Sequence, residues 1–258
     1  MAFLQVQFFS DALAVSVTVN MIMPEPKQGI GMASSDTRQL PKVLYLLHGY
    51  SDDHSIWMRR TSVERYASAH NLAVIMPAVN HSFYTNEKHG ERYWDFVAQE
   101  LPAAMHKFFR LSDKAEDTFV AGLSMGGSGA RKLALTYPER FGAAASFSGA
   151  VDLVGHMLEK AGKNPPEDRV FGDLTKLKGS ENDLFHLMEK NSTAPAKPRL
   201  YVACGDKDFL HKGNLLFVPA LKKHGWDVTY HEEPGATHEW GFWDEQIKFF
   251  IPWMLGEK

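Results

Sequence analysis

The sequence contains a single cysteine, Cys204, among its 258 residues. One cysteine cannot form a disulfide within the chain, which favours a reducing compartment. No apolar run is long enough to cross a bilayer. The first nine residues alternate like a strand, without the basic segment and apolar stretch of a secretion signal. We therefore expect a cytoplasmic protein without a membrane span.

An excess of charge of either sign is also lacking. The chain has 28 Lys and Arg against 31 Asp and Glu, a net charge of −3, which argues against a nucleic-acid or anionic-membrane partner. Internal repeats, low-complexity tracts and a linker between two cores are absent as well. The length suits one large domain over residues 1–258, and the composition leaves a homo-oligomer open.

The pattern of apolar residues predicts an α/β fold. Two β-rich runs, 3–9 and 15–21, are separated by Asp11 and Ala12, which predicts a hairpin. Apolar strands then alternate with helical patterns to the end of the chain, which predicts a mostly parallel central sheet of about eight strands with helices on both faces. The strands are expected at 43–47, 72–76, 118–122, 143–147, 199–203 and 228–231, and the helices at 61–71, 93–109, 125–137, 214–224 and 242–254.

Three segments depart from this alternation. Residues 24–41 have no periodicity and are expected to form a surface loop. Pro102 lies inside the helical pattern at 93–109, so the helix either kinks there or restarts with proline in its first turn. Residues 151–197 carry two short helical patterns, 153–160 and 182–189, among prolines and glycines. We interpret this segment as a small cap-like insertion over the sheet edge.

The most informative motif is Gly-x-Ser-x-Gly at residues 122–126, between the apolar strand at 118–122 and a helical run. In this context the motif is typical of the nucleophile elbow of α/β-hydrolases, a sharp turn that exposes the serine hydroxyl. Glycine is needed at Gly122 and Gly126 because neighbouring chains press against the elbow. Ser124 is therefore the predicted nucleophile, and the backbone N–H of Met125 at the helix start is a predicted oxyanion donor.

A serine nucleophile needs a histidine base and an acid, which follow it in this order in the fold: serine, acid, histidine. Four histidines lie after the strand at 199–203. His224 belongs to a helical pattern beside two lysines, His231 to a strand, and His211 comes too early. His238 lies in the loop between the last strand and the last helix and is the predicted base.

Two neighbouring aspartates follow the strand at 199–203, and both are placed to be the acid. Asp208 is favoured because Phe209 and Leu210 are expected to bury beside it and shield its bond to the histidine. Asp206 is closer to the strand end and is the alternative, with a role in capping the loop.

The second oxyanion donor is expected in the loop after the third strand. There Gly49 permits a close approach of the backbone to the substrate, and the N–H of Tyr50 is the predicted donor. The aromatic side chains in loops at the catalytic edge are candidate contacts for an apolar ester: Trp57, Phe83, Tyr84 and Trp240. Other apolar side chains near the site, such as Tyr93, Trp94 and Trp243, are expected to be mostly core.

Several motifs together resemble the esterase D-like branch of the α/β-hydrolases, and closely the small bacterial tributyrin esterases. The resemblance runs from the third strand to the last helix and is carried by these segments: Leu46-Leu47-His48-Gly49, Tyr84-Thr85, Glu100-Leu101-Pro102, residues 121–127, Ser146-Phe147-Ser148-Gly149, residues 204–210 and Gly235-x-x-His238-Glu239-Trp240. It implies the α/β-hydrolase fold, a triad of Ser124, Asp208 and His238, and neither a cofactor nor a metal.

The resemblance implies a serine carboxylesterase that acts on small-molecule esters with short acyl chains. Feruloyl esterases are a second possibility within the branch. S-formylglutathione hydrolases usually have a cysteine shortly after the oxyanion glycine, whereas Gly49 is followed here by Tyr-Ser-Asp-Asp. Mycolyltransferases of the branch are exported, so the expected lack of a secretion signal counts against this activity. A non-catalytic α/β-hydrolase that binds a ligand is the alternative from another class, and transfer of the acyl group to an alcohol or thiol also stays open.

Overall fold

The computed structural model describes residues 1–25, 30, 38–163 and 165–257. In this part of the chain, eight strands form one sheet in the order β1-β2-β4-β3-β5-β6-β7-β8. The β1–β2 and β2–β4 pairs are antiparallel, and all the others are parallel. The strands are β1 (Ala2–Ser10), β2 (Val15–Met23), β3 (Lys42–Leu47), β4 (Leu72–Met76), β5 (Thr118–Leu123), β6 (Ala143–Phe147), β7 (Arg199–Gly205) and β8 (Val228–Glu233).

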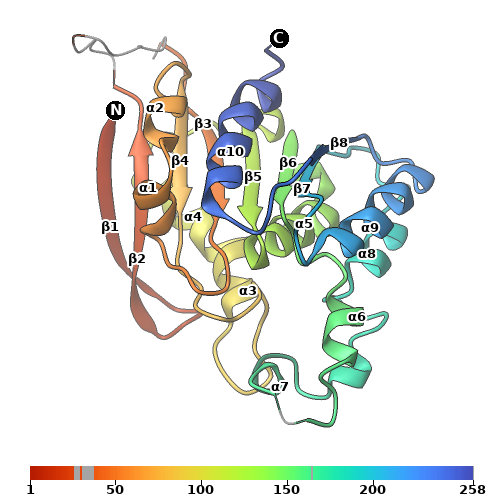
Figure 1. Ribbon diagram of the computed structural model, residues 1–258. Helices are drawn as coiled ribbons and strands as arrows, with labels where there is room; N and C mark the ends of the chain where they lie inside the picture. Colours follow the sequence, from red (N-terminus) through yellow and green to blue (C-terminus); the bar gives the residue numbers. More distant parts are fainter. Residues whose placement is uncertain (26–29, 31–37, 164, 258) are drawn as a thin grey trace.

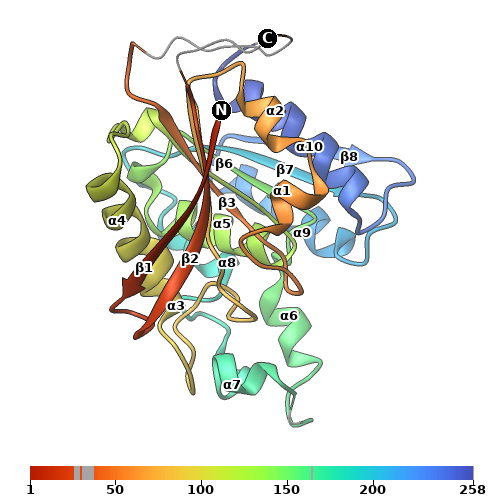
Figure 2. The ribbon, with the colours of Figure 1, turned by 90° about the vertical axis from the view of Figure 1, so that its left-hand side faces the viewer.

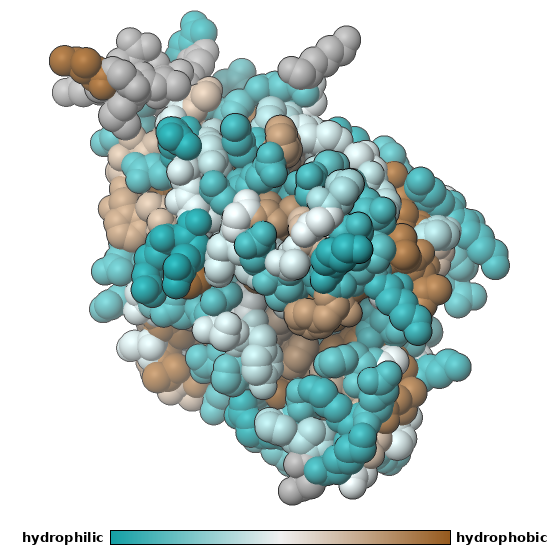
Figure 3. Space-filling view, in the orientation of Figure 1, coloured by the Kyte–Doolittle hydropathy of each residue, from teal (hydrophilic) through white to brown (hydrophobic). Residues whose placement is uncertain are grey.

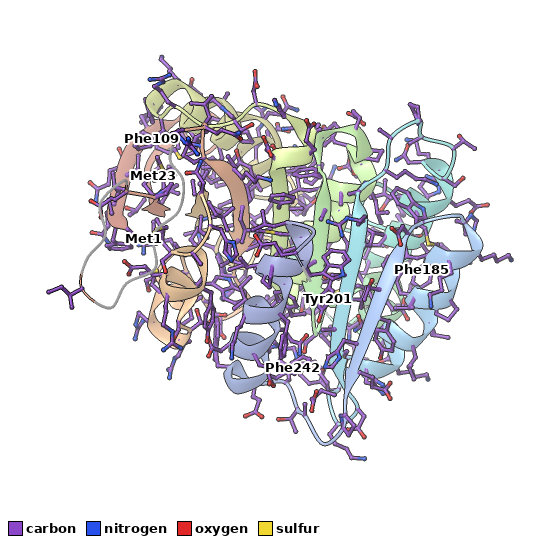
Figure 4. All side chains as sticks on the ribbon, turned by 90° about the horizontal axis from the view of Figure 1, so that it is seen from above. Met1, Met23, Phe109, Phe185, Tyr201 and Phe242 are labelled. Carbon is purple, nitrogen blue, oxygen red and sulfur yellow. The ribbon has the colours of Figure 1, made fainter. Side chains whose placement is uncertain are left out.

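Helices cover both faces of the sheet, as predicted (Figures 1 and 2). One face packs against α1 (Ile56–Arg60), α2 (Val63–Ala67) and α10 (Trp240–Met254). The other packs against α3 (Tyr93–Asp95), α4 (Leu101–Phe108), α5 (Met125–Thr136), α8 (Leu184–Lys190) and α9 (His211–Lys223). Figure 4, seen from above the sheet, shows Tyr201 and Phe242 on the α10 side and Phe109 on the opposite side.

The central strands β3, β4, β5 and β6 are buried along almost their whole length. Continuous apolar runs are what a parallel strand covered on both faces requires. By contrast, β1 at the sheet edge alternates between half-buried and exposed residues. The predicted hairpin is present, but its turn spans residues 11–14 and includes Ala14 with φ of +50°. Most of the loop expected over 24–41 lies outside the described residues.

The helical pattern at 93–109 forms three consecutive pieces. A π-helical turn, η1 (Phe96–Glu100), separates α3 from α4, and Pro102 falls in the first turn of α4. Pro102 therefore lies in the first turn of α4, as the second alternative predicts, but the helical conformation is continuous from Tyr93 to Phe108. Because Pro102 has no N–H to give to the carbonyl of Ala98, that carbonyl is free to accept a hydrogen bond from Arg140 at 2.8 Å.

The helix expected over 61–71 is shorter than predicted and is preceded by α1, which the sequence analysis missed. α2 ends at Ala67, and the Thr61 hydroxyl accepts a hydrogen bond from the N–H of Val63 at 3.2 Å. α1 is a single turn that buries Ile56 and Trp57 against the sheet. Five residues are too few to display a helical period, so its position is set by packing.

The segment expected as an insertion divides into two parts. The first contains α6 (Leu153–Leu158), α7 (Glu167–Phe171) and η4 (Leu174–Lys176), and lies beyond the carboxyl ends of the parallel strands (Figure 1). Leu153, Met157, Leu174 and Leu177 form a small core of its own. The second part, α8, instead packs on α5 and α9 in the main helical layer. The protruding part is thus shorter than 151–197, and α7 was not expected.

Candidate active site

Ser124 lies in a strained turn between β5 and α5. Its φ of +51° and ψ of −117° are a backbone conformation that a residue with a side chain rarely adopts. Two hydrogen bonds hold the turn: the Ser124 N–H donates to the Phe147 carbonyl at 2.9 Å, and the Ser124 carbonyl accepts from the Ala150 N–H at 3.2 Å. The strain lifts the side chain of Ser124 off the sheet and leaves it half-buried, as the elbow motif predicts.

The two glycines of the elbow motif lie against the backbone of neighbouring segments. A Cβ at Gly122 would come within 2.4 Å of the Gly126 carbonyl group, and a Cβ at Gly126 within 2.4 Å of the Leu47 carbonyl oxygen and 2.6 Å of that of His48. Backbone atoms of a central strand cannot move aside easily. The close packing at both positions is therefore the physical reason for glycine on each side of Ser124.

Gly126→Ala is expected to destabilise the protein by about 1–3 kcal/mol or more, because the added methyl overpacks the elbow against β3. Gly241→Ala is the matched control, since Gly241 is also helical and a Cβ there would have its nearest neighbour 4.0 Å away. The control should unfold within about 1 kcal/mol of the wild type. Urea or thermal unfolding measures both changes, and equal stability of the two variants would contradict the packing argument.

Asp208 and His238 are brought together from the loops after β7 and β8. The Oδ2 atom of Asp208 lies 2.9 Å from Nδ1 of His238, so Nδ1–H donates to the carboxylate and Nε2 is the free acceptor of the ring. The side chain of Asp208 is fully buried, while that of His238 is 19% exposed. Phe209 packs on one side of the imidazole at 4.5 Å between ring centroids, and Trp243 on another at 4.8 Å.

The surroundings of Asp208 keep its carboxylate ionised. Burial alone would raise its pKa, but hydrogen bonds from His238, from the Ser148 hydroxyl and from the Leu210 N–H together lower the pKa below its usual range. Ser148 is fully buried, has a φ of +48°, and accepts a hydrogen bond from the Trp243 indole at 3.0 Å. Sequence reasoning missed this role of Ser148, although the residue lies directly after β6 at the carboxyl edge.

Asp206 and the other candidate histidines make different contacts. The Oδ1 atom of Asp206 accepts a hydrogen bond from the Gly235 N–H at 2.7 Å and thereby links the loop after β7 to the loop that carries His238. His211 pairs with Glu232, and His231 with Glu233. One expectation was wrong: Phe209 does not bury beside Asp208 but is 72% exposed, because its ring lies over the outer side of His238.

The two predicted oxyanion donors come from different segments, Met125 from the elbow itself and Tyr50 from the loop after β3. The N–H groups of Tyr50 and Met125 have no hydrogen-bond acceptor within the described part of the chain. A Cβ at Gly49 would lie 3.7 Å from Cβ of Ser124 and only 2.6 Å from the Leu123 side chain, so the loop after β3 runs directly past the serine. Two unpaired N–H groups beside a serine are the arrangement that stabilises an oxyanion.

Two further residues in this loop were missed by sequence reasoning. His48 is buried, accepts a hydrogen bond from the Val79 N–H at Nε2 and contacts the Gly49 carbonyl through Nδ1 at 2.7 Å. Burial lowers its pKa to about 4, so it stays neutral. Asp52 accepts a hydrogen bond from the Gly49 N–H at 3.2 Å, and the charge of His238 lowers its pKa while burial raises it by more. Asp52 is thereby tied to the backbone of Gly49, the residue before Tyr50.

The aromatic side chains expected at the substrate divide into two groups. Trp57 and Tyr84 are 1% and 0% exposed, and their polar atoms donate to the backbone carbonyls of Leu47 and His48. Contact of these two side chains with substrate is therefore not supported, because both are buried and hydrogen-bonded to β3 or to the loop that follows it. Phe83 and Trp240 are half-buried and stay candidates: Phe83 lies 5.5 Å from the Tyr50 ring, and Trp240 packs edge-on against Trp57.

A groove of about 240 Å³ runs beside the site between α6 and the start of α9. Its lining includes Ala150, whose N–H donates to the Ser124 carbonyl, together with Gly149, Phe209, His156, Glu159 and Lys212. Leu215 and Leu216 of α9 are about half exposed in the same region, where apolar surface is visible in Figure 3. Among the described residues, no group of three or more His, Cys, Asp or Glu side chains is arranged to hold a metal ion.

The sheet order, the strained serine after β5 and the acid–histidine pair after β7 and β8 define an α/β-hydrolase. The solved structure of FphF, a fluorophosphonate-binding serine hydrolase of Staphylococcus aureus, has the same fold: the TM-score is 0.87 at 36% identity, over 98% of each chain. A Staphylococcus aureus structure described as S-formylglutathione hydrolase (FrmB) matches with a TM-score of 0.85 at 34% identity, over 98% of each chain.

The chain belongs to the family described as "Putative esterase", whose model matches residues 10–251. It is 33% identical over 264 residues to the acetyl esterase of Caldicellulosiruptor saccharolyticus, and the alignment covers 98% of each chain. The protein is therefore a carboxylesterase of the serine hydrolase type. None of the helices in the described ranges combines the length and apolar character that a membrane span requires.

Proposed function

We propose that the protein hydrolyses short-chain acyl esters through an acyl-enzyme on Ser124, with His238 as general base and Asp208 as the acid that orients it. The observation that carries this proposal is the 2.9 Å contact between Asp208 and Nδ1 of His238. It fixes the imidazole tautomer in which Nε2 is free to take the serine proton. The strained Ser124 and the unpaired N–H groups of Tyr50 and Met125 support the same mechanism.

The proposed reaction has two halves. Oγ of Ser124 attacks the ester carbonyl as its proton passes to Nε2 of His238, and the oxyanion accepts hydrogen bonds from the N–H groups of Tyr50 and Met125. The attack forms a tetrahedral intermediate. Its collapse breaks the ester bond, and the imidazolium of His238 gives the proton to the leaving alcohol. A water molecule then repeats the sequence on the acyl-enzyme: His238 takes its proton, the acid is released, and the proton returns to Ser124.

Turnover of 4-nitrophenyl butyrate, together with labelling of Ser124 by a fluorophosphonate, tests this function. Hydrolysis with catalytic amounts of protein and mass-spectrometric labelling at Ser124 are the expected results. A folded protein that shows neither would instead be the non-catalytic binding protein. The likeness to a structure described as S-formylglutathione hydrolase gives a specific reason to include thioesters of the same acyl chains, and methyl ferulate tests the hydroxycinnamoyl alternative.

The acyl preference is expected to lie at short chains. The protruding part of the insertion has a small core of its own and leaves Ser124 half-buried, which suits a partly covered site. Each methylene that fits gains about 0.8 kcal/mol by burial, whereas one that does not fit costs strain. We expect kcat/KM for 4-nitrophenyl esters to peak between acetate and butyrate and to fall before octanoate. Activity that rises through decanoate, or jumps at a lipid interface, would identify a lipase with a mobile lid.

A further inference from the structure

Lys132 is a buried cation on the elbow helix α5 that the mechanism above does not use. The residue is only 4% exposed, and no carboxylate among the described residues lies within ion-pair distance of it. Its Nζ atom instead donates to Oδ1 of Asn182 at 2.6 Å and to Oγ1 of Thr85 at 2.9 Å, and lies 4.3 Å from the centre of the Trp94 ring. Burying an ammonium group without an anion is costly, so its retention requires a reason.

The partners of Lys132 lie on two segments that reach the catalytic edge. Thr85 lies within the loop that connects β4 to α3, and Asn182 lies between η4 and α8, near the end of the protruding insertion. The Thr85 hydroxyl also donates to Oδ1 of Asn182 at 2.6 Å, so the three side chains form one closed network. Lys132 thereby ties both segments to the helix that begins at the nucleophile.

The loop held at Thr85 is strained at the two preceding residues. Phe83 and Tyr84 have φ values of +51° and +54°, in the left-handed region that residues with side chains avoid. Such a conformation persists only where the surroundings impose it. Two contacts with α5 do so: the Lys132 network at Thr85, and the Tyr84 ring against Gly129, where a Cβ would come within 2.5 Å of Cγ of Tyr84.

The same loop packs against the residues that carry the proposed oxyanion donor. The Tyr84 hydroxyl donates to the His48 carbonyl at 2.9 Å, and the Val79 N–H donates to Nε2 of His48. The Phe83 ring lies 5.5 Å from that of Tyr50, and His81 stacks on Tyr50 at 4.2 Å. Contacts therefore run without interruption from Lys132 through Thr85, Tyr84 and Phe83 to His48 and Tyr50.

We propose that Lys132 is a positioning residue for the oxyanion hole: it fixes the loop of residues 79–85 against the elbow helix and so holds the Tyr50 N–H in register with that of Met125. The proposal rests on the proposed esterase function. One donor is built on the first residue of α5, and the other on the separate loop after β3. A connection between the two is needed because their relative placement decides how well they meet the oxyanion.

The chemistry of the network suits this purpose. Burial lowers the pKa of Lys132 to about 7, whereas the negative charges of Glu181 and Asp95 act to raise it. The three acceptors around Nζ, which include the Tyr84 carbonyl at 3.5 Å, and the Trp94 face fix the direction of the Lys132 amino group. A methionine of similar length would fill the same space without making any of these hydrogen bonds.

Lys132→Met is expected to lower kcat and kcat/KM for 4-nitrophenyl butyrate by the same factor, on the order of 10–100, because misplacement of one donor weakens binding of the transition state only. Affinity for a trifluoromethyl ketone, which forms the same oxyanion, should fall by a similar factor. Lys132→Arg should restore part of kcat, since it returns donors to Thr85 and Asn182.

Arg131→Met is the matched control for lost stability. Arg131 is the neighbouring residue on α5 and is fully buried, but it donates to the carbonyls of Ala144 and Tyr201 in the sheet and not to the loop. The control should unfold more easily and keep the kcat of its folded fraction. A Lys132→Met protein that is destabilised yet keeps wild-type kcat would overturn the proposal, as would equal kcat losses in the two variants.

Thr85→Val and Asn182→Ala separate the two arms of the network and also serve if Lys132→Met does not fold. Thr85→Val removes the contact with the loop and is expected to lower kcat. Asn182→Ala keeps the bond between Lys132 and Thr85 and should lower kcat less; the reverse order would overturn the route through the loop. Wild-type turnover tests the esterase function separately, because only the ratio of variant to wild type reports on Lys132.

Discussion

Ser124→Ala is expected to lower kcat by on the order of 10⁶ and to leave the fold intact. Removal of the serine of a triad in another hydrolase costs about this much, and Ser124 is the only hydroxyl residue within the elbow motif at 122–126. Alanine adopts the space of the serine without a new contact, so the thermal midpoint should stay close to that of the wild type. Steady-state turnover of 4-nitrophenyl butyrate and a thermal scan measure the two effects.

His238→Ala is expected to cost a similar factor, because serine and base act as one unit and loss of either stops proton transfer. The double variant should therefore be no worse than either single one. If Ser124→Ala retained more than about a tenth of the wild-type activity, the elbow would not be the site of the chemistry. Circular dichroism distinguishes loss of the nucleophile from loss of the fold.

Asp208→Asn is expected to lower kcat by on the order of 10⁴, which is less than loss of the serine. An asparagine at this place presents an N–H toward Nδ1 of His238 and favours the wrong tautomer, an effect of this size in the serine-protease triad. Asp206→Asn is the matched control, since the two residues share a loop. Its Oδ1 atom still accepts the hydrogen bond from the Gly235 N–H, so the loss should stay below about tenfold.

Equal losses from the two aspartate variants would mean that Asp206 shares the role of the acid. The pH profile gives a second check. Hydrogen bonds lower the pKa of Asp208 despite its burial, so its carboxylate stays ionised as the pH falls toward its ordinary range. Followed by NMR over pH, the Asp208 carboxyl group of the wild type should therefore take up its proton below the range of an ordinary aspartate.

The parts of the site that are local in the chain were predictable. The sequence at 118–126 combines a buried strand, a turn flanked by glycines and a helix start, and each of these follows from neighbouring residues. The strained φ of Ser124 agrees with this prediction. The order serine, acid, histidine excluded His211, and the helical and strand patterns excluded His224 and His231, which left His238.

The choice between Asp206 and Asp208 needed more than position. Both residues follow β7, and the shielding expected from Phe209 was wrong because that ring is exposed. The hydrogen bond to His238 depends on where the loop after β8 folds back, and the Gly235 N–H bound by Asp206 helps to place it. Contacts between loops 30 residues apart leave no local pattern in the chain.

The sequence by itself determined the eight strands in chain order, the elbow at Ser124 and the segments expected to supply its partners, because these features depend on short-range periodicity and on the chemistry of single residues. Only the tertiary structure decided that Trp57 and Tyr84 are buried supports, that α8 belongs to the main helical layer, and that Lys132 reaches Thr85 and Asn182. Burial and the hydrogen-bond partner of a polar group are properties of the packed chain. The sequence pattern of a helix does not distinguish a long polar side chain that is exposed to solvent from one that is buried and hydrogen-bonded to other side chains.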